Sequence, residues 1–149
     1  MDRFMVRMAV PRDLAQMAAL DARVQRLPWS LSALSQEMGS RFSRIWVVFP
    51  LNSHHTVAGF LLFRMVMDEI YVVQFSIDIP WQRRGAGKMA MNLLIRYGQQ
   101  CGSERIVLDV SPDNDGAIGF YTSFGFMIQG GETKRVQGRR NLIMDLSLR

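Results

Sequence analysis

The stretch Ile79-Pro80-Trp81-Gln82-Arg83-Arg84-Gly85-Ala86-Gly87 decides how the whole chain is interpreted. It follows an apolar run over residues 70–78 that predicts a strand, and it leads into residues 85–100, whose apolar spacing predicts a helix. Glycines let main-chain amides approach a ligand closely, and the start of a helix offers unpaired N–H donors with partial positive charge. We therefore predict a pyrophosphate site formed by Gln82, Arg83, Arg84, Gly85, Ala86, Gly87 and Lys88.

Other phosphate-binding motifs fit this stretch less well. A phosphate-loop NTPase needs a glycine, any four residues and then Gly-Lys-Ser/Thr, but Gln82 stands at the first position and Met89 at the last. A dinucleotide-binding motif fits residues 85–90, and Asp109 follows at about the expected distance. That motif begins directly after its strand, however, whereas residues 79–84 intervene here. The last alternative is a plain helix start with incidental arginines, which the preceding Gln-Arg-Arg disfavours.

The rest of the chain predicts an antiparallel sheet followed by one crossover unit. The expected strands cover residues 4–10, 44–49, 57–67, 70–78, 106–110, 126–129 and 142–148, and the expected helices begin at residues 11, 30, 85 and 115. A strand–helix–strand unit over residues 70–110 normally makes its two strands parallel. With 149 residues, we expect a single domain over residues 1–149.

Composition narrows the class of protein. A formal net charge of +5 suits a phosphate-rich ligand or another polyanion, and 48% hydrophobic residues can form a core. The single cysteine, Cys101, cannot form an internal disulfide, so we expect a reducing, cytoplasmic compartment. Since zinc needs about four ligands and no such cluster is evident, no metal is expected. The sequence shows no signal peptide or membrane span, and no membrane association is expected.

Two motifs in the expected order give the chain a family resemblance. Residues 82–87, QRRGAG, match the Q/R-x-x-G-x-G/A motif of the GCN5-related N-acetyltransferase (GNAT) superfamily. Residues 114–126, NDGAIGFYTSFGF, match its N-x-x-A-x-x-x-Y-x-x-x-G-F signature. The chain resembles the superfamily throughout in element order, and best over residues 68–126. Within it, the chain is most similar to the ribosomal-protein alanine N-acetyltransferase (RimI) group, through Pro28-Trp29-Ser30 and Asp68-Glu69.

The resemblance implies a fold and a cosubstrate site. The fold class is α+β (α/β three-layer): a mixed, mostly antiparallel sheet of about seven strands, with helices on both faces and a splayed central parallel pair. Acetyl-CoA is the implied cosubstrate, and its pantetheine arm pairs with the main chain of Phe75, Ser76 and Ile77 like an added strand. An N–H near Ile77 is the implied donor to the carbonyl oxygen that gains charge. Asn114 is implied to contact the coenzyme or to cap the helix that follows it.

The catalytic residues are also implied by the resemblance. Tyr121 matches the tyrosine that protonates the leaving thiolate, with a buried packing aromatic as the alternative. For the base that takes the amine proton, Asp109 is the first candidate, because its strand is otherwise apolar. A salt bridge or a hydrogen bond is the alternative role for Asp109. Glu69 is the second candidate, with a solvated turn as its alternative.

The chain is different from that group at two places, and both concern the acceptor. Asp109 stands where the group tends to have glutamate, and residues 130–140 contain no tyrosine. We expect transfer from acetyl-CoA to a primary amine by direct attack in a ternary complex, the amine being a protein N-terminus, possibly of a ribosomal protein. The alternatives are a small-molecule amine, and a noncatalytic module that binds acyl-CoA or nucleic acid. Trp29 is a candidate for the acceptor cleft, and the basic residues 134–140 for guiding the substrate, while direct nucleic-acid binding is not expected. A monomer and a homodimer are both compatible with the sequence.

Overall fold

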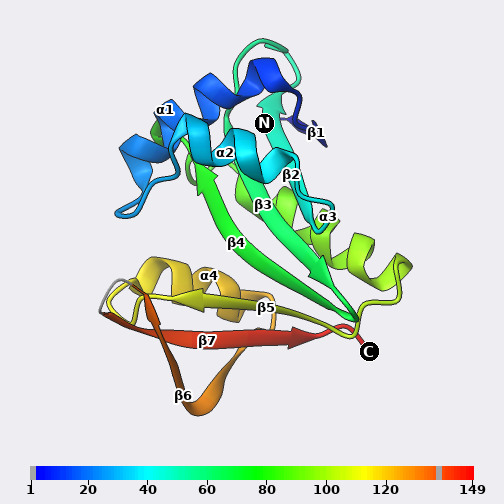
Figure 1. Cartoon of the computed structure of the whole chain (residues 1–149), viewed down its shortest axis with the longest axis vertical. Helices are drawn as coiled ribbons and strands as arrows, with labels where there is room; N and C mark the ends of the chain where they lie inside the picture. Colours follow the sequence, from blue (N-terminus) through cyan, green and yellow to red (C-terminus); the bar gives the residue numbers. More distant parts are fainter. Residues whose placement is uncertain (1–2, 137–138) are drawn as a thin grey trace. The chain divides into compact units, whose positions relative to one another are not determined.

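The computed structural model describes residues 3–136 and 139–149, and its element order confirms the expected fold class. The strands are β1 (Phe4–Met8), β2 (Ser43–Pro50), β3 (Gly59–Val66), β4 (Glu69–Ile77), β5 (Arg105–Val110), β6 (Met127–Val136) and β7 (Arg139–Ser147). The helices are α1 (Leu14–Val24), α2 (Leu31–Met38), α3 (Ala86–Gln100) and α4 (Asp115–Ser123), with short 3₁₀ turns η1 (Pro11–Asp13) and η2 (Ile79–Trp81). The strands form one sheet in the order β1-β2-β3-β4-β5-β7-β6, in which β4 and β5 are parallel (Figure 1).

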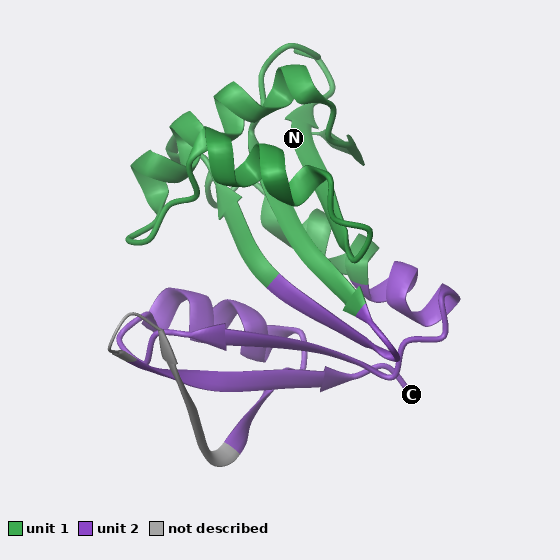
Figure 2. Cartoon of the chain, in the orientation of Figure 1, with its two compact units in different colours: residues 1–65, 73–94 green, residues 66–72, 95–149 purple. Residues whose placement is uncertain are grey.

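The chain forms two compact units, and both β4 and α3 contribute to each of them (Figure 2). Unit 1 contains residues 1–65 and 73–94, and unit 2 contains residues 66–72 and 95–149.

Unit 1 buries apolar side chains on both faces of its strands. On one face, Leu20 of α1 and Leu34 of α2 pack with Val47 and Phe60. On the other face of the strands, Ala86 and Ala90 of α3 pack with Val48 of β2. Val47 and Val48 point to opposite faces because side chains alternate along a strand. Helices therefore cover both faces of the unit 1 strands, as the resemblance implied.

Unit 2 contains the parallel ladder and the C-terminal strands. Residues 69–72 of β4 pair with residues 105–108 of β5, which in turn pairs antiparallel with β7. The last turns of α3 lie on this part of the sheet: a Cβ atom at Gly98 would come within 2.7 Å of Leu148 and 2.9 Å of Ile70. A larger residue at position 98 would therefore have to displace the ends of the Leu148 and Ile70 side chains.

The last two strands are longer than the sequence predicted. A loop was expected over residues 130–140, but β6 runs to Val136 and β7 begins at Arg139. The register shifts between Ile128 and Thr133, so one ladder accommodates an irregular, polar stretch. The hydrogen bonds between strands join main-chain groups and do not require apolar side chains. The polar composition of residues 130–140 therefore wrongly indicated a loop. Residues 134–140 were predicted to guide a substrate, but most of their side chains lie outside the part of the chain that the structure describes.

Candidate active site

The predicted phosphate-binding stretch is a tight turn that opens helix α3. Strand β4 ends at Ile77, η2 follows directly after Asp78, and α3 begins at Ala86, one residue after its predicted start. Arg83 and Gly85 have φ angles of 61° and 93°, in the left-handed region. Left-handed residues close together in a turn aim successive N–H groups into one concavity, which is an anion-binding arrangement. Gly85 is exposed, and a Cβ atom there would meet nothing within 4 Å, so its backbone conformation and not crowding favours glycine at this position.

Side chains around the turn fix its shape. The Gln82 side-chain amide donates to the Ile77 carbonyl at 2.9 Å. The Arg84 guanidinium donates to the Pro80 carbonyl at 3.0 Å and lies over the Trp81 ring. Arg84 therefore stabilises the turn itself. Arg83 and Lys88 are exposed on the same turn and on the first turn of α3.

An ion pair anchors the entrance to this turn. The Asp78 carboxylate accepts from the Ile79 N–H at 2.9 Å and from Arg23 of α1 at 2.8 Å. The hydrogen bond from Arg23 lowers the pKa of Asp78, with the Ile79 N–H acting in the same direction against the effect of burial. The C-terminal part of α1 is thereby linked to the start of η2.

The end of β4 presents main-chain groups on two edges. The Asp78 N–H bonds to the Ala58 carbonyl at 2.8 Å, so the main chain at Ser76 is directed toward β3 and that of Phe75 and Ile77 to the opposite edge. The Ser76 side chain is only 2% exposed and donates to Asp21 at 2.6 Å. Of the three predicted pantetheine-binding residues, Phe75 and Ile77 thus have the main-chain orientation that an added strand would require.

In unit 2, Asp109 lies beside a tyrosine that the sequence reasoning missed. The Tyr71 hydroxyl donates to Oδ2 of Asp109 at 3.2 Å. Tyr71 is paired in register with Val107, two residues before Asp109, so alternation places both side chains on one face. Only the parallel register of β4 and β5 reveals that Tyr71 adjoins Asp109, and the sequence alone does not give this register. Together these residues form a half-buried carboxylate–phenol pair.

Glu69 lies in a different environment. Its carboxylate forms an ion pair with Arg105, which also bonds to Asp145 at 3.1 Å. The hydrogen bond that Arg105 donates to Glu69 is the main cause of the raised pKa of Arg105. Glu69 of β4 is paired in register with Arg105 of β5. Asp109 lies four residues beyond Arg105 along β5, which corresponds to roughly 13 Å in an extended strand. The structure therefore does not bring the two candidate bases, Glu69 and Asp109, together.

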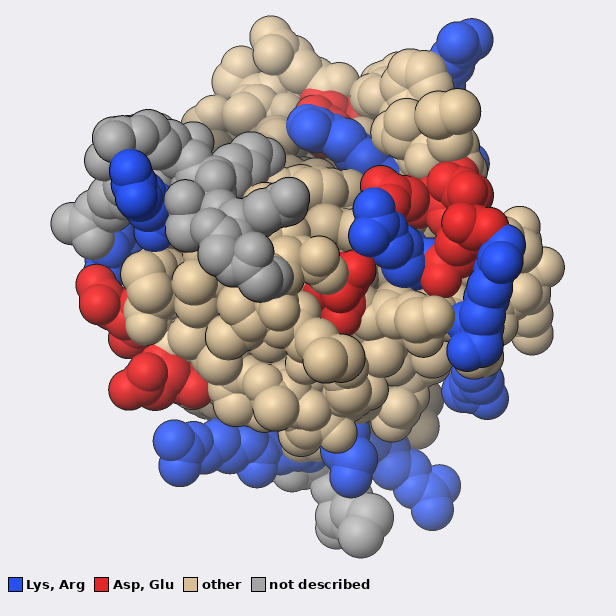
Figure 3. Space-filling model, turned by 90° about the horizontal axis from the view of Figure 1, so that it is seen from below, with Lys and Arg blue, Asp and Glu red and all other residues tan. Residues whose placement is uncertain are grey.

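On one face of the molecule, acidic and basic side chains lie next to one another (Figure 3).

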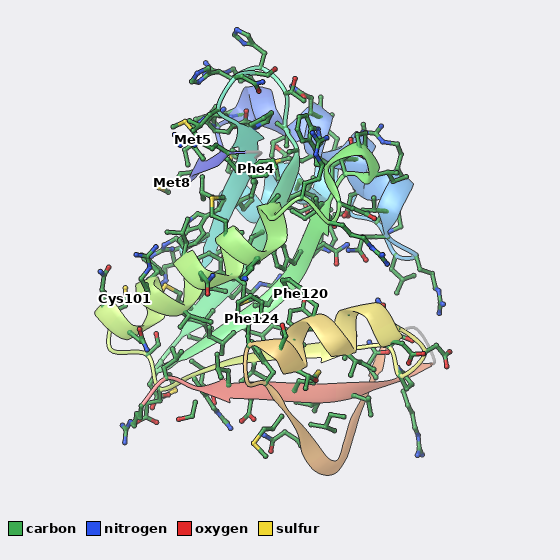
Figure 4. All side chains as sticks on the ribbon, turned by 180° about the vertical axis from the view of Figure 1, so that it is seen from behind. Phe4, Met5, Met8, Cys101, Phe120 and Phe124 are labelled. Atoms are coloured by element: carbon green, nitrogen blue, oxygen red, sulfur yellow. The ribbon has the colours of Figure 1, made fainter. Side chains whose placement is uncertain are left out.

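Helix α4 carries the other predicted catalytic residue. Asn114 caps this helix by accepting from the Ala117 N–H at 3.0 Å, which is one of its two predicted roles. Tyr121 is half-buried. Its ring contacts those of Phe120 and Phe126 edge-on, with 5.4 Å between the ring centroids in each pair. Phe120 lies on this helix, and its ring centroid is 5.1 Å from that of Phe124, which follows directly after the helix (Figure 4). Burial raises the pKa of Tyr121 above its usual value, which already lies well above neutral pH.

Among residues 3–136 and 139–149, no three His, Cys, Asp or Glu side chains are grouped so that they could hold a metal ion. In the same part of the chain, no helix has the length and hydropathy of a membrane span.

Comparison with known proteins defines the class of this chain. The Acetyltransferase (GNAT) family matches residues 13–126, which run through both units, and the chain belongs to this family. It is an N-acetyltransferase. The [ribosomal protein bS18]-alanine N-acetyltransferase of Escherichia coli strain K12 is 28% identical over 114 residues, covering 76% of this chain and 74% of that protein. The enzyme of the same name from Salmonella typhimurium is 29% identical over the same share of each chain.

Solved structures show the same fold. The crystal structure of the ribosomal-protein-S18-alanine N-acetyltransferase from Escherichia coli has a TM-score of 0.81 at 23% identity, covering 98% of this chain and 94% of that chain. The PaiA N-acetyltransferase from Thermoplasma acidophilum, crystallised in complex with coenzyme A, has a TM-score of 0.78 at 14% identity, covering 97% and 99%.

Proposed function

We propose that this N-acetyltransferase transfers an acetyl group from acetyl-CoA to the α-amine of a protein N-terminus, by direct attack in a ternary complex. The observation that carries the proposal is the turn that opens α3, in which Arg83 and Gly85 both have left-handed φ angles. A concavity of main-chain N–H groups at the start of a 15-residue helix suits two linked phosphates.

The residues of this turn fit the pyrophosphate of acetyl-CoA. The amides over residues 83–88 would bind the phosphate oxygens, and the exposed Arg83 and Lys88 would add charge. Gln82 and Arg84 would act by shaping the turn, because each already bonds to a main-chain carbonyl. The outer edge of β4 at Phe75 and Ile77 would bind the pantetheine arm. An N–H at this edge would stabilise the oxygen that becomes negatively charged.

The proposed proton acceptor and proton donor of the reaction, Asp109 and Tyr121, are residues of unit 2. An α-amine has a pKa of about 7.7–8.0, so a modest base suffices to keep it neutral. Asp109 would take its proton, directly or through a water molecule, with the Tyr71 hydroxyl orienting the carboxylate. Tyr121 would donate its phenolic proton to the departing thiolate, because a phenol carries its proton at neutral pH. Glu69 is the weaker candidate, since its carboxylate is bound to Arg105.

The proposed acceptor comes from the named relatives, whose substrate is an alanine of a ribosomal protein. We therefore propose a peptide with a free N-terminal alanine as the first acceptor to test. A cytoplasmic location, consistent with the single cysteine, and a monomer or homodimer remain predictions.

The test is thiol release from acetyl-CoA over a panel of amines. The panel contains N-terminal peptides beginning with different residues, the same alanine peptide with a blocked amine, and small amines such as spermidine. We expect release with the free alanine peptide and none with the blocked one. Preferential release with the small amines would replace the proposed acceptor class. Absence of coenzyme A binding by calorimetry, with folded protein, would refute the proposal as a whole.

A further inference from the structure

A fully buried carboxylate, Asp21 of α1, lies at the centre of a hydrogen-bond network in unit 1. Asp21 is 0% exposed and forms no ion pair within the described part of the chain. Its oxygens accept from the Trp29 N–H at 2.7 Å, from the Gln74 side-chain amide at 2.9 Å and from the Ser76 hydroxyl at 2.6 Å. A buried charge is costly unless hydrogen bonds satisfy it, and three neutral donors do so here.

This network ties the connection between α1 and α2 to β4 at several points. Gln74 also donates to the Leu27 carbonyl at 3.3 Å. The side-chain amide nitrogen of Gln25 donates to the Phe75 carbonyl at 3.1 Å and to the Ser76 hydroxyl oxygen at 2.8 Å. The segment from Gln25 to Trp29 is therefore held against the end of β4.

The direction of each hydrogen bond follows from chemistry. An ionised carboxylate only accepts, so the Ser76 hydroxyl hydrogen points to Asp21 and the Ser76 oxygen accepts from Gln25. The Phe75 carbonyl also only accepts, so both amide hydrogens of Gln25 are used. The orientation of the Gln25 carboxamide is thus fixed by its two neighbours.

This orientation leaves one hydrogen-bonding atom available. Oε1 of Gln25 accepts no hydrogen bond from the residues that the structure describes. Among those residues, no buried side-chain nitrogen or oxygen is without a partner, so this oxygen is reachable from solvent. The same connection exposes Leu27 by 42% and, just after it, Leu31 by 49%. An oriented oxygen with exposed apolar side chains nearby suits an N–H group attached to a small apolar residue.

We infer that Oε1 of Gln25 binds an N–H group of the acceptor peptide, and that Asp21 is the positioning residue that sets the Gln25 carboxamide through Ser76. The inference rests on the proposed function, and it commits to the acceptor and not to the N–H groups of the pantetheine arm. The amide nitrogen of Gln25 faces the Phe75 carbonyl at the proposed pantetheine edge, whereas its Oε1 atom is the acceptor group that remains available. Gln25 belongs to the connection between the first two helices, which also carries the exposed Leu27.

The test compares Gln25→Met with the wild type, using acetyl-CoA and a peptide with a free N-terminal alanine. Methionine has a similar length but neither donates nor accepts a strong hydrogen bond. We expect the acceptor KM to rise about tenfold, which corresponds to about 1.4 kcal/mol. This rise should exceed any loss of coenzyme A affinity measured by calorimetry, because the amide nitrogen of Gln25 also contacts the Phe75 carbonyl. An unchanged acceptor KM overturns the inference, and so does weaker coenzyme A binding with the acceptor KM unaffected.

The role of Asp21 is tested by a double-mutant cycle. Asn at position 21 can donate to Ser76 and so release the direction of that hydroxyl. We expect Asp21→Asn to raise the acceptor KM in the wild type but not in the Gln25→Met background, because Asp21 acts through Gln25. Additive effects overturn the positioning role. Asp13→Asn is the matched control, since this carboxylate is also buried in unit 1 but bonds to Arg7; it should lower stability without changing the acceptor KM.

Two failures can be told apart. A wild-type protein that releases no thiol with any amine refutes the proposed function, and this inference with it. A wild-type protein that acetylates the peptide, together with a Gln25→Met variant of equal KM, refutes only the inference.

Discussion

Substituting Gly59 with alanine should damage the active site although it removes no polar group. Gly59 opens β3, and a Cβ atom there would lie 2.5 Å from the Ser76 carbonyl oxygen and 3.2 Å from the Ile77 Cα atom. An ordinary contact begins at 3.4 Å, so the end of β4 must move away by roughly 0.9 Å. Overpacking of this kind costs about 1–3 kcal/mol of stability. A displacement of about 1 Å in a group that orients a substrate costs on the order of 100-fold in rate.

The assay combines urea unfolding with thiol release. We expect Gly59→Ala to lower the unfolding midpoint with an unchanged m-value, and to reduce kcat/KM by about 100-fold at temperatures where it is folded. Gly39→Ala is the control, because a Cβ atom there meets its nearest neighbour at 3.4 Å and the backbone is right-handed helical. If Gly59→Ala matched the control in both stability and rate, the close approach of β3 to β4 would not be a constraint, and the reasoning would be wrong.

Three further predictions concern single polar groups. Tyr121→Phe should lower kcat by about 100-fold or more while leaving coenzyme A binding by calorimetry unchanged; an unaltered kcat would exclude the phenol as the acid. Asp109→Asn should lower kcat/KM by a similar factor of about 100, and full activity across the pH range would transfer the role of base to Glu69. Because Arg23 lowers the pKa of Asp78, this carboxylate stabilises the fold above its unfolded pKa of about 3.9 and loses that effect as pH falls through its lower folded pKa. The difference in Tm between wild type and Asp78→Asn should therefore shrink between about pH 5 and pH 3, and a difference independent of pH would contradict this assignment.

Much of the fold was predictable because its signals are local. The start of α3 after Gly85, the cap at Asn114 and the cap at Ser30 each depend on residues within one helical turn. The polar stretch over residues 130–140 was predicted as a loop for the same reason. Its strand pairing depends on a partner elsewhere in the chain, which no local pattern reveals.

The sequence by itself determined the class of protein, the order of the elements and the turn that opens α3, since glycine and helix-start chemistry act over a few neighbouring residues. Only the tertiary structure decided which side chains meet. It placed Tyr71 on Asp109, Arg105 on Glu69, and Gln25 against the Phe75 carbonyl. These pairs are 36 to 50 residues apart in the chain. Their contacts depend on strand register and helix packing, which long-range burial fixes and which spacing along the sequence does not encode.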